Sequence, residues 1–357
     1  MNRDRAARDG SAGARPAANP MFATVVPGLA GLVTEDLEQL PGVRVTGAGS
    51  DIVLFEAGRG GRPGLRALRT AEGLFAETGR ATRSGGDTAA GIARRVWAPD
   101  GVQRALSAWA ADVRPLSGAM TFQVVAGLLH ERSFSRADLR KALIQAIARD
   151  KPRWRTDGRA QLEISVTEYA PGQLVAGLRL ADASRAQPDE AAGRPGALRP
   201  AVAAMMVGFA GEPRDVLLDP CCASGTILGA ALAAGWPAVQ GSDLDPDAVA
   251  AARRNVPAAG VVLGDAHGID LPGESVDAVV SRLPVGEQYK VNGEMRKWLT
   301  PVLAEIARVT AVGGRVVLLA PTIPNNAMPR ELPVRRKEPI RTPGAKTILW
   351  VCDRVRT

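Results

Sequence analysis

Cysteine, histidine and aromatic residues are scarce in this chain of 357 residues. It has three cysteines (Cys221, Cys222 and Cys352), two histidines (His130 and His267) and 4% aromatic residues. The cysteines are odd in number and show no C-x-x-C spacing. We therefore expect neither disulfides nor a bound metal.

Long apolar runs are also absent. No segment approaches the roughly 20 apolar residues that cross a bilayer, and the first 20 residues lack the apolar stretch of a signal peptide. Hydrophobic residues make up 46% and charged residues 23% of the chain, which is typical of a folded soluble protein. These observations predict a cytoplasmic protein that does not bind a membrane.

The net charge of +8 is unevenly distributed along the chain. Residues 1–200 hold 28 Lys and Arg against 21 Asp and Glu, whereas residues 201–357 hold 17 against 16. The segment 130–159 alone carries nine basic and four acidic residues. Such a cluster suits contact with a polyanion, although a solvated helix face in an arginine-rich protein explains it equally well. The candidate contact residues are Arg132, Arg136, Arg140, Lys141, Lys151, Arg153 and Arg155.

Composition and periodicity divide the chain into four folded or linking parts and a tail. We predict a disordered tail at 1–20, small α+β domains at 21–112 and 113–184, a polar, Pro/Gly-rich linker at 185–200, and a larger domain at 201–357. In the larger domain apolar strand runs alternate with helical segments, which predicts a parallel, doubly wound α/β sheet.

Ligands of such sheets bind beyond the carboxyl ends of the strands. The first strand of the larger domain ends in DPCCASGT at 219–226, where small residues open a helix. The second ends in Asp243, the third in Asp265-Ala266, and the fourth in SRLPVG at 281–286. There is neither a G-x-G-x-x-G pattern nor a Walker lysine. We therefore expect a nucleoside site without a phosphate-binding loop.

This order of motifs resembles the class I methyltransferases that use S-adenosylmethionine. DPCCASGTILGAAL is similar to the DP-x-C-G-S-G-T signature of RNA methyltransferases, and GSDLDPDAVAAARRN and GDAHGIDLP are similar to the motifs that follow it. Upstream, PGLAGLVTEDLEQL resembles the ferredoxin-like N-terminal domain of THUMP-domain methyltransferases, and the segment from TFQVVAGLLHERSF onward resembles the THUMP domain. The resemblance covers about residues 21–357. It implies a Rossmann-like methyltransferase domain behind ferredoxin-like and THUMP domains that dock an RNA.

The resemblance also implies roles for single residues. It places Asp219, Ala223, Ser224, Gly225 and Thr226 around the methionine part of the cofactor, Asp243 on the ribose, and Asp265 with Ala266 at the adenine. Other roles are open for several of these and for their neighbours. Ser224 and Thr226 would also serve as helix caps, and Asp245 and Asp247 suit the first turn of a helix. Cys221 and Cys222 fit small loop fillers better than nucleophiles, because no base is paired with them.

The fourth strand end departs from the family. Its members carry N-P-P-Y or N-L-P-F-G there, whereas this chain has Arg282 and Val285 at the Asn and aromatic positions and keeps Pro284 and Gly286. Arginine only donates hydrogen bonds and valine has no stacking face. We take Arg282, Pro284 and Glu287 as candidate catalytic residues, with Tyr289 as a candidate for stacking on the target base. Ala223 replaces the family's usual glycine.

Three functions agree with this sequence. The first is a methyltransferase of an RNA base in tRNA or rRNA, such as a tRNA guanine methyltransferase. The second is an rRNA methyltransferase that modifies an adenine ring nitrogen and confers antibiotic self-resistance, because an in-plane lone pair needs no Asn. The third is an inactive RNA-binding protein, which the intact cofactor acids disfavour.

Overall fold

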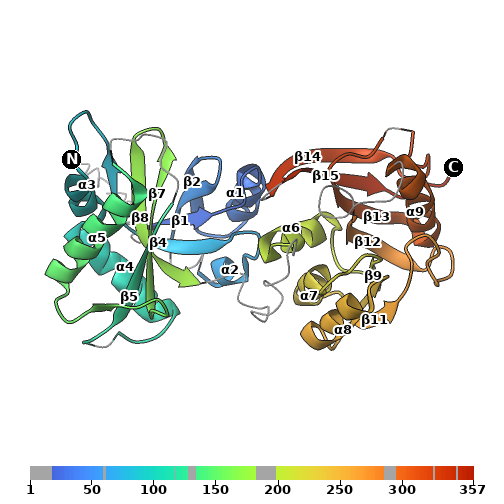
Figure 1. Cartoon of the computed structure of the whole chain (residues 1–357), viewed down its shortest axis with the longest axis horizontal. Helices are drawn as coiled ribbons and strands as arrows, with labels where there is room; N and C mark the ends of the chain where they lie inside the picture. The colour runs from blue at the N-terminus through green and yellow to red at the C-terminus, as the bar shows by residue number, and fades with distance from the viewer. Residues whose placement is uncertain are drawn as a thin grey trace, which may run out of the picture.

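The chain folds into two lobes joined through a helical centre (Figure 1). The computed structural model describes residues 18–58, 62–116, 118–127, 134–181, 198–284, 295–324, 326–342 and 345–357. None of the helices within these ranges is long and apolar enough to span a bilayer.

The N-terminal lobe is built on one eight-stranded sheet of order β2-β3-β1-β4-β8-β7-β5-β6. β4 and β8 pair antiparallel at its centre, so the sheet runs through both predicted N-terminal domains. The elements are β1 (Asn19–Thr24), α1 (Ala30–Glu38), β2 (Val43–Ala48), β3 (Ile52–Ala57), α2 (Arg62–Ala67), β4 (Gly73–Thr82), α3 (Ala89–Val96), α4 (Pro99–Asp112), β5 (Thr121–Ala126), α5 (Arg136–Asp150), β6 (Arg155–Thr156), β7 (Leu162–Ala170) and β8 (Gln173–Ala181).

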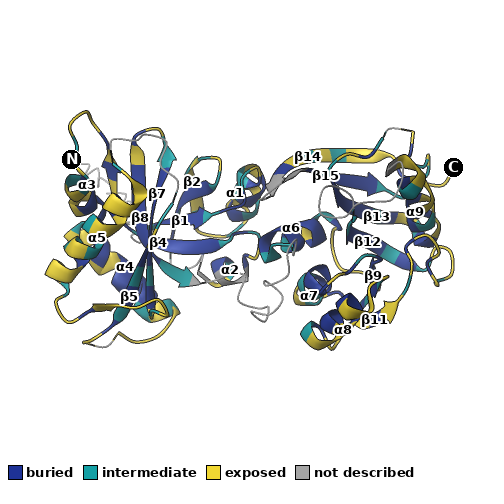
Figure 2. Ribbon diagram, in the orientation of Figure 1, coloured by how far each residue is buried: buried dark blue, intermediate teal, exposed yellow. Residues whose placement is uncertain are grey.

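Helix α5 illustrates how local sequence sets these elements. Ser135 caps it, and its side chain and that of Asp138 form reciprocal hydrogen bonds with each other's backbone N–H. Leu139, Leu143 and Ile147 recur every four residues and are fully buried against the sheet. The remaining faces of α5 are largely exposed (Figure 2), which leaves its basic residues on the surface.

The C-terminal lobe is a seven-stranded sheet of order β11-β10-β9-β12-β13-β15-β14. The five strands from β11 to β13 in this order are parallel to one another, whereas β15 and β14 form an antiparallel hairpin at one edge. The elements are α6 (Pro200–Phe209), β9 (Val216–Asp219), α7 (Thr226–Ala233), β10 (Ala238–Asp243), α8 (Pro246–Asn255), β11 (Gly260–Leu263), β12 (Val276–Arg282), α9 (Met295–Val309), β13 (Thr310–Ala320), β14 (Val334–Thr342) and β15 (Ala345–Asp353).

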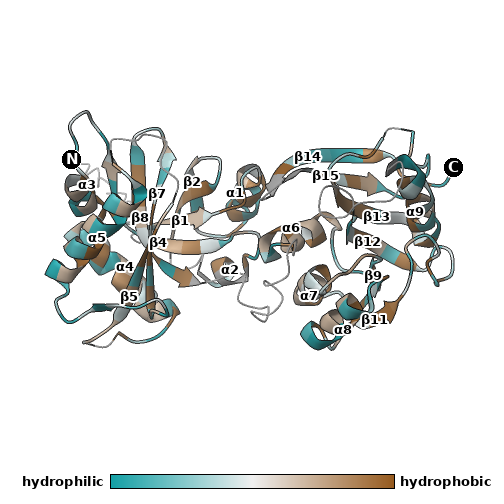
Figure 3. Cartoon of the chain, viewed as in Figure 1, coloured by the Kyte–Doolittle hydropathy of each residue, from teal (hydrophilic) through white to brown (hydrophobic). Residues whose placement is uncertain are grey.

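Separate hydrophobic clusters cover the two faces of this sheet. One holds buried residues of α6, α7 and α8, and the other holds buried residues of α9. Alternate residues of the central strands supply both clusters: Val317 and Leu319 face the first, and Val316 and Leu318 face the second. Hydrophobic residues accordingly concentrate in the strands and in α6 (Figure 3). The predicted α/β class and doubly wound, Rossmann-like C-terminal domain are confirmed.

The two lobes share a packed junction. Leu29 and Leu32 at the start of α1 belong to the same buried cluster as Met206 of α6. Arg199 Nη1 forms an ion pair with Glu72 Oε1 at 2.5 Å, and Arg336 Nη2 of β14 lies 3.8 Å from Glu35 Oε1 of α1. The N-terminal lobe is therefore held against α6 and the β14–β15 hairpin.

The structure differs from the sequence predictions at several boundaries. β1 begins at Asn19, before Met21, where we expected order to begin. α3 and α4 pack in one core with α5, β5, β7 and β8, although the predicted boundary at 112 groups them with the preceding domain. β14 was not predicted, because its sequence VRRKEPIRT is charged and contains Pro339. Most of the predicted tail and linker lies outside the described residues, and the domain bounds stay predictions.

Candidate cofactor pocket

A pocket of about 500 Å³ opens at the carboxyl ends of β9, β10, β11 and β12. Leu198, just before α6, and Trp298 of α9 also contribute to its wall. The strand ends bring together most of the residues that the sequence singled out. These are Asp219, Ala223, Ser224, Thr226, Asp243, Asp265, Ala266, Arg282 and Pro284. Gly225 lies within the same loop, at the start of α7.

Asp219 at the end of β9 is a buried acid, with 1% of its surface exposed. Its Oδ1 accepts hydrogen bonds from Ser281 Oγ at 2.6 Å and from the Cys221 backbone N–H at 3.1 Å. Burial raises the pKa of Asp219 to about 7; the two hydrogen bonds oppose the shift and the charge of Asp243 adds to it. A cationic group in the pocket would favour the ionised carboxylate.

The loop after β9 uses two left-handed backbone conformations. Ala223 has φ of 46° and Gly225 has φ of 87°. A Cβ on Gly225 would also lie 3.0 Å from Val256 Cγ2, a tight contact, so both the backbone conformation and the available space favour glycine there. Ala223 occupies the family's usual glycine position, and its positive φ explains that preference. Gly225 is the N-cap of α7 without a side-chain hydrogen bond, so neither Ser224 nor Thr226 occupies the capping position.

Asp243 is fixed by the backbone on both sides of its carboxylate. Oδ2 accepts a hydrogen bond from the Ala223 N–H at 2.8 Å, and Oδ1 accepts one from the Asp245 N–H at 3.0 Å. Asp245 is the N-cap of α8 and Asp247 lies in its first turn, which confirms their interpretation as helix-start acids. The carboxylate of Asp243 therefore has a set orientation at the pocket wall.

Asp265 forms hydrogen bonds with His267, whose ring in turn contacts Trp298. From the sequence, neither residue was expected to have a role in the pocket. Asp265 Oδ1 accepts the His267 N–H at 2.9 Å and lies 2.8 Å from His267 Nδ1. The backbone hydrogen bond from His267 is the main cause that lowers the pKa of Asp265; burial opposes it, and the hydrogen bond and charge of the His267 side chain lower the pKa further. The His267 ring meets Trp298 edge-on at 5.3 Å. The rings of His267 and Trp298 thus form aromatic surface beside Asp265. Leu244, which is 70% exposed, adds apolar surface to the same pocket.

The two cysteines of the loop are poorly suited to act as nucleophiles. Burial is the main cause that raises the pKa of both Cys221 and Cys222, and the charges of Asp219 and Asp243 raise them further. A thiol that stays protonated is a weak nucleophile. This agrees with the interpretation of both residues as loop fillers.

The fourth strand end is described only in part. Arg282 and Pro284 line the pocket, and Leu283 between them is buried. Val285, Gly286, Glu287 and Tyr289 lie outside the described residues.

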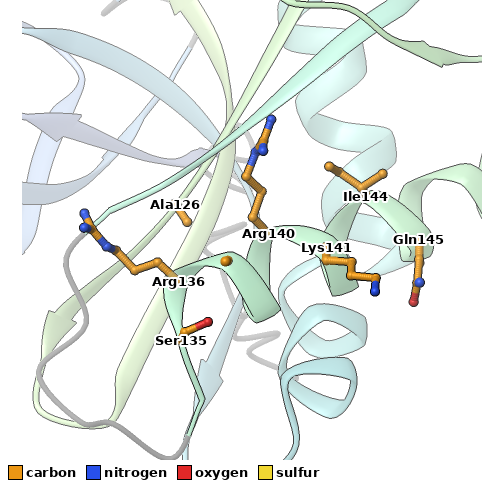
Figure 4. Close-up of a pocket in the computed structure, with 8 residues that line it drawn as sticks. Ala126, Ser135, Arg136, Arg140, Lys141, Ile144 and Gln145 are labelled. Carbon is orange, nitrogen blue, oxygen red and sulfur yellow. The ribbon is translucent and has the colours of Figure 1, made fainter.

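The predicted basic cluster separates into two groups in the structure. Arg136, Arg140 and Lys141 project from the first two turns of α5 and line a second pocket of about 780 Å³ with Ser135 and Gln145 (Figure 4). Lys151, Arg153 and Arg155 follow the other end of this 15-residue helix, roughly 20 Å away. Arg155 Nη1 donates to the carbonyls of Pro152 and Trp154. Arg132 lies outside the described residues.

Acidic, histidine and cysteine side chains do not gather into a metal-binding group within the described ranges. No set of three or more of them could hold an ion there. Asp219, Asp243 and Asp265 follow three different strands and face the pocket as separate acceptors.

A family model described as "RMKL-like, methyltransferase domain" matches residues 190–338. The U6 snRNA (guanine-N(2))-methyltransferase THUMPD2 of Bos taurus is 37% identical over 112 residues, which are 29% of this chain and 21% of the relative. The Homo sapiens protein of the same name is 35% identical over 111 residues, with coverage of 29% and 21%. The match therefore spans about a fifth of these curated relatives.

Solved structures share the whole two-lobed fold. TrmN from Thermus thermophilus superposes with a TM-score of 0.70 at 23% identity, covering 94% of this chain and 99% of the other. SMU.472 complexed with SAH superposes with a TM-score of 0.65 at 14% identity, covering 95% and 99%. At these sequence identities the solved structures show a shared fold and nothing more. The match to the family model lies mostly in the C-terminal lobe. Residues 190–338 of this chain are thus similar to the methyltransferase domain of the RMKL-like family, in agreement with the sequence motifs.

Proposed function

We propose that the chain is an S-adenosylmethionine-dependent methyltransferase of an RNA base. The observation that carries the proposal is the arrangement of Asp219, Asp243 and Asp265 around one pocket at the ends of three adjacent parallel strands. The domain family and the names of the relatives that match it support the same activity.

The residues present fit S-adenosylmethionine. The buried carboxylate of Asp219 suits the cationic amino acid part, because a positive charge offsets the cost of ionising an acid whose pKa is raised to about 7. The oriented carboxylate of Asp243 suits the ribose hydroxyls. Asp265 with Ala266 suits the adenine, and Leu244 offers apolar surface for the ring. Ala223, Ser224, Gly225 and Thr226 shape the loop beside the methionine part.

Catalysis by this chain consists chiefly of positioning. S-adenosylmethionine would supply, when bound, a methyl group on a sulfonium sulfur, from which the neutral thioether S-adenosylhomocysteine is a good leaving group. Arg282 and Pro284 lie beside Asp219 at the pocket wall and would orient the acceptor nucleotide at near-attack distance. A base in an RNA helix reaches such a pocket only when it leaves its stack. The basic group at Arg136, Arg140 and Lys141 would contact RNA phosphates without reading sequence.

Guanine N2 is the target that we propose, in tRNA or rRNA. The matching relatives are named guanine-N(2)-methyltransferases. An adenine ring nitrogen is the second candidate, and the presence of Arg282 where the family carries Asn favours it, since arginine cannot accept a hydrogen bond from an exocyclic amine.

Calorimetric titration with S-adenosylmethionine and S-adenosylhomocysteine tests the cofactor site. Asp243→Ala should weaken binding of both at least tenfold, because it removes an oriented carboxylate from the pocket. Asp247→Ala is the matched control: Asp247 is exposed two residues beyond the pocket-lining Asp245, and its loss should leave binding unchanged. Equal affinities of the two variants would contradict the assignment.

A further inference from the structure

Basic residues of the C-terminal lobe are concentrated in one segment of its sequence. The segment 330–346 holds six basic and two acidic residues, whereas the rest of 201–357 holds eleven basic and fourteen acidic residues. Four acids line the pocket at the ends of β9, β10 and β11: Asp219, Asp243, Asp245 and Asp265. These negative charges would repel a polyanion that approached the pocket from this side.

The β14–β15 hairpin lies on the other side of Arg282. In the sheet order, β9, β10 and β11 stand to one side of β12, and β13, β15 and β14 stand to the other. β14 runs parallel to β13, because both pair antiparallel with β15. Its carboxyl end therefore lies at the same end of the sheet as the pocket. The positions of Arg341 and Lys346 pair with each other there.

Two cations of β14 are available to solvent. β14 is the terminal strand of the sheet, and it is exposed and hydrophilic over much of its visible face (Figures 2 and 3). The Arg335 side chain is 62% exposed and has only a loose ion pair with Asp353 at 3.7 Å. Lys337 is exposed, and its Nζ lies 4.3 Å from the centre of the buried Trp350 ring. The ring orders the lysine without neutralising its charge.

The hairpin also adjoins the N-terminal lobe. Ile340 and Leu349 pack in the same cluster as Leu29 and Leu32 near the start of α1, and Figure 1 shows one end of β14 beside α1 and the rest of the strand along the C-terminal lobe. Arg336, on the opposite face from Lys337, is engaged at this junction with Glu35 and stands 5.1 Å over the Phe209 ring. Arg335 lies near the amino end of β14, at the level of the Arg315–Asp353 pair, and Lys337 lies two residues closer to the end that adjoins the N-terminal lobe. Both cations therefore lie on the exposed edge of the sheet that leads away from this junction along the C-terminal lobe.

We infer that the β14–β15 hairpin is a second RNA-backbone contact, at the edge of the sheet opposite the strands that carry the acids of the pocket. This inference rests on the proposed RNA substrate. Phosphates are the matching chemistry, because Arg335 and Lys337 offer point charges rather than a shaped pocket. Charged edge strands also prevent sheets from aggregating, and the test separates that role from RNA binding.

The test compares pairs of substitutions by binding of unfractionated tRNA and rRNA over a range of salt concentrations. Arg335→Gln/Lys337→Gln should weaken binding several-fold at about 100 mM salt and reduce the slope of log K against log salt by about 1 to 2. Arg335→Lys/Lys337→Arg keeps both charges and should bind as the unmodified protein does. The matched control is Arg214→Gln/Arg254→Gln, which removes two charges at the amino end of β9 and the end of α8; it should keep the slope.

Calorimetry with S-adenosylhomocysteine and light scattering accompany these titrations, and both should be unchanged in the hairpin variant. RNA binding equal to that of the control pair would overturn the hairpin contact, as would self-association of the hairpin variant with an unchanged salt slope. If the unmodified protein bound the cofactor but neither RNA, the proposed substrate and the hairpin contact would both be overturned.

Discussion

Ser281 Oγ donates a 2.6 Å hydrogen bond to Asp219 Oδ1, and this contact joins the end of β12 to the end of β9 inside the pocket wall. Ser281 is fully buried and Asp219 nearly so. The bond holds the acid in one position next to Arg282, which follows Ser281 directly. The pocket therefore contains a buried acid with a fixed orientation, and its protonation has consequences for both stability and binding.

Asp219→Asn should make the ligand-free protein more stable at pH 8. The folded-state pKa of Asp219 is raised from 3.8 to about 7, so folding opposes its ionisation. Its contribution to stability is greatest below about pH 4, declines as the pH rises to 7, and stays unfavourable above that. The gain from Asn, which keeps the acceptor for Ser281, is up to about 4 kcal/mol at pH 8 and smaller at pH 5. Urea unfolding at both pH values measures it; a larger gain at pH 5 would contradict the raised pKa.

Cofactor affinity should fall as the pH drops below 7. A cationic ligand favours ionised Asp219, and below its pKa of about 7 binding must first remove a proton. The affinity of S-adenosylhomocysteine, which keeps the ammonium group, should decrease by up to about tenfold per pH unit between pH 7 and 5.5. Calorimetric titration across this range provides the measurement. Asp219→Asn should bind more weakly at pH 8 and lose most of the pH dependence; an unaltered pH profile in this variant would remove Asp219 as its cause.

Ala223→Gly should stabilise the protein, and Gly225→Ala should destabilise it. Ala223 has φ of 46°, where an L-residue is strained, so glycine should gain about 0.5–1 kcal/mol after its own entropy cost. Gly225→Ala adds strain at φ of 87° and a contact with Val256 at 3.0 Å, and should cost about 2 kcal/mol. Denaturant unfolding of both variants is the check. Changes of the same sign at the two positions would be inconsistent with this backbone.

Arg282→Ala should abolish methyl transfer while cofactor binding is retained. Arg282 is the last residue of β12 and lines the pocket together with Asp219. We expect kcat to fall at least a hundredfold, with the Kd for S-adenosylhomocysteine within twofold of the unmodified protein. Arg296→Ala, an exposed position in the first turn of α9, is the control. Unchanged turnover in Arg282→Ala would exclude Arg282 from catalysis.

Removing two cations from the start of α5 should weaken RNA binding. Arg136 and Lys141 line one pocket with Arg140, whose Nε is occupied by the Val124 carbonyl at 2.9 Å. Arg136→Gln/Lys141→Gln should reduce affinity several-fold and the salt slope by about 1 to 2. Arg94→Gln/Arg104→Gln removes two exposed charges from α3 and α4 and should have a smaller effect. Gel-shift titration compares the RNA affinities of the two variants. Equal losses of affinity would mean that the α5 residues act only through the net charge of the protein.

Much of the cofactor pocket could be predicted because strand ends are recognisable in the sequence. Asp219, Asp243 and Asp265 each follow an apolar strand run, and parallel strands place such residues at one edge. His267 and Trp298 were missed, since their contact depends on how α9 packs against the loop after β11. The basic segment was predicted as one cluster, yet the length of α5 separates its two groups. β14 was missed because its stability comes from pairing with β15 and from burial of Ile340 rather than from its own propensity.

The most direct measurement is transfer of radiolabelled methyl from S-adenosylmethionine to unfractionated tRNA and, separately, to intact ribosomal subunits, followed by mass spectrometry of the labelled nucleoside. We predict N2-methylguanosine in one of these RNAs, formed by the unmodified protein and absent with Asp243→Ala. Ring-methylated adenosine would favour the second candidate and keep the cofactor site. No label in either RNA, from a protein that binds S-adenosylmethionine, would contradict an RNA methyltransferase acting on these substrates.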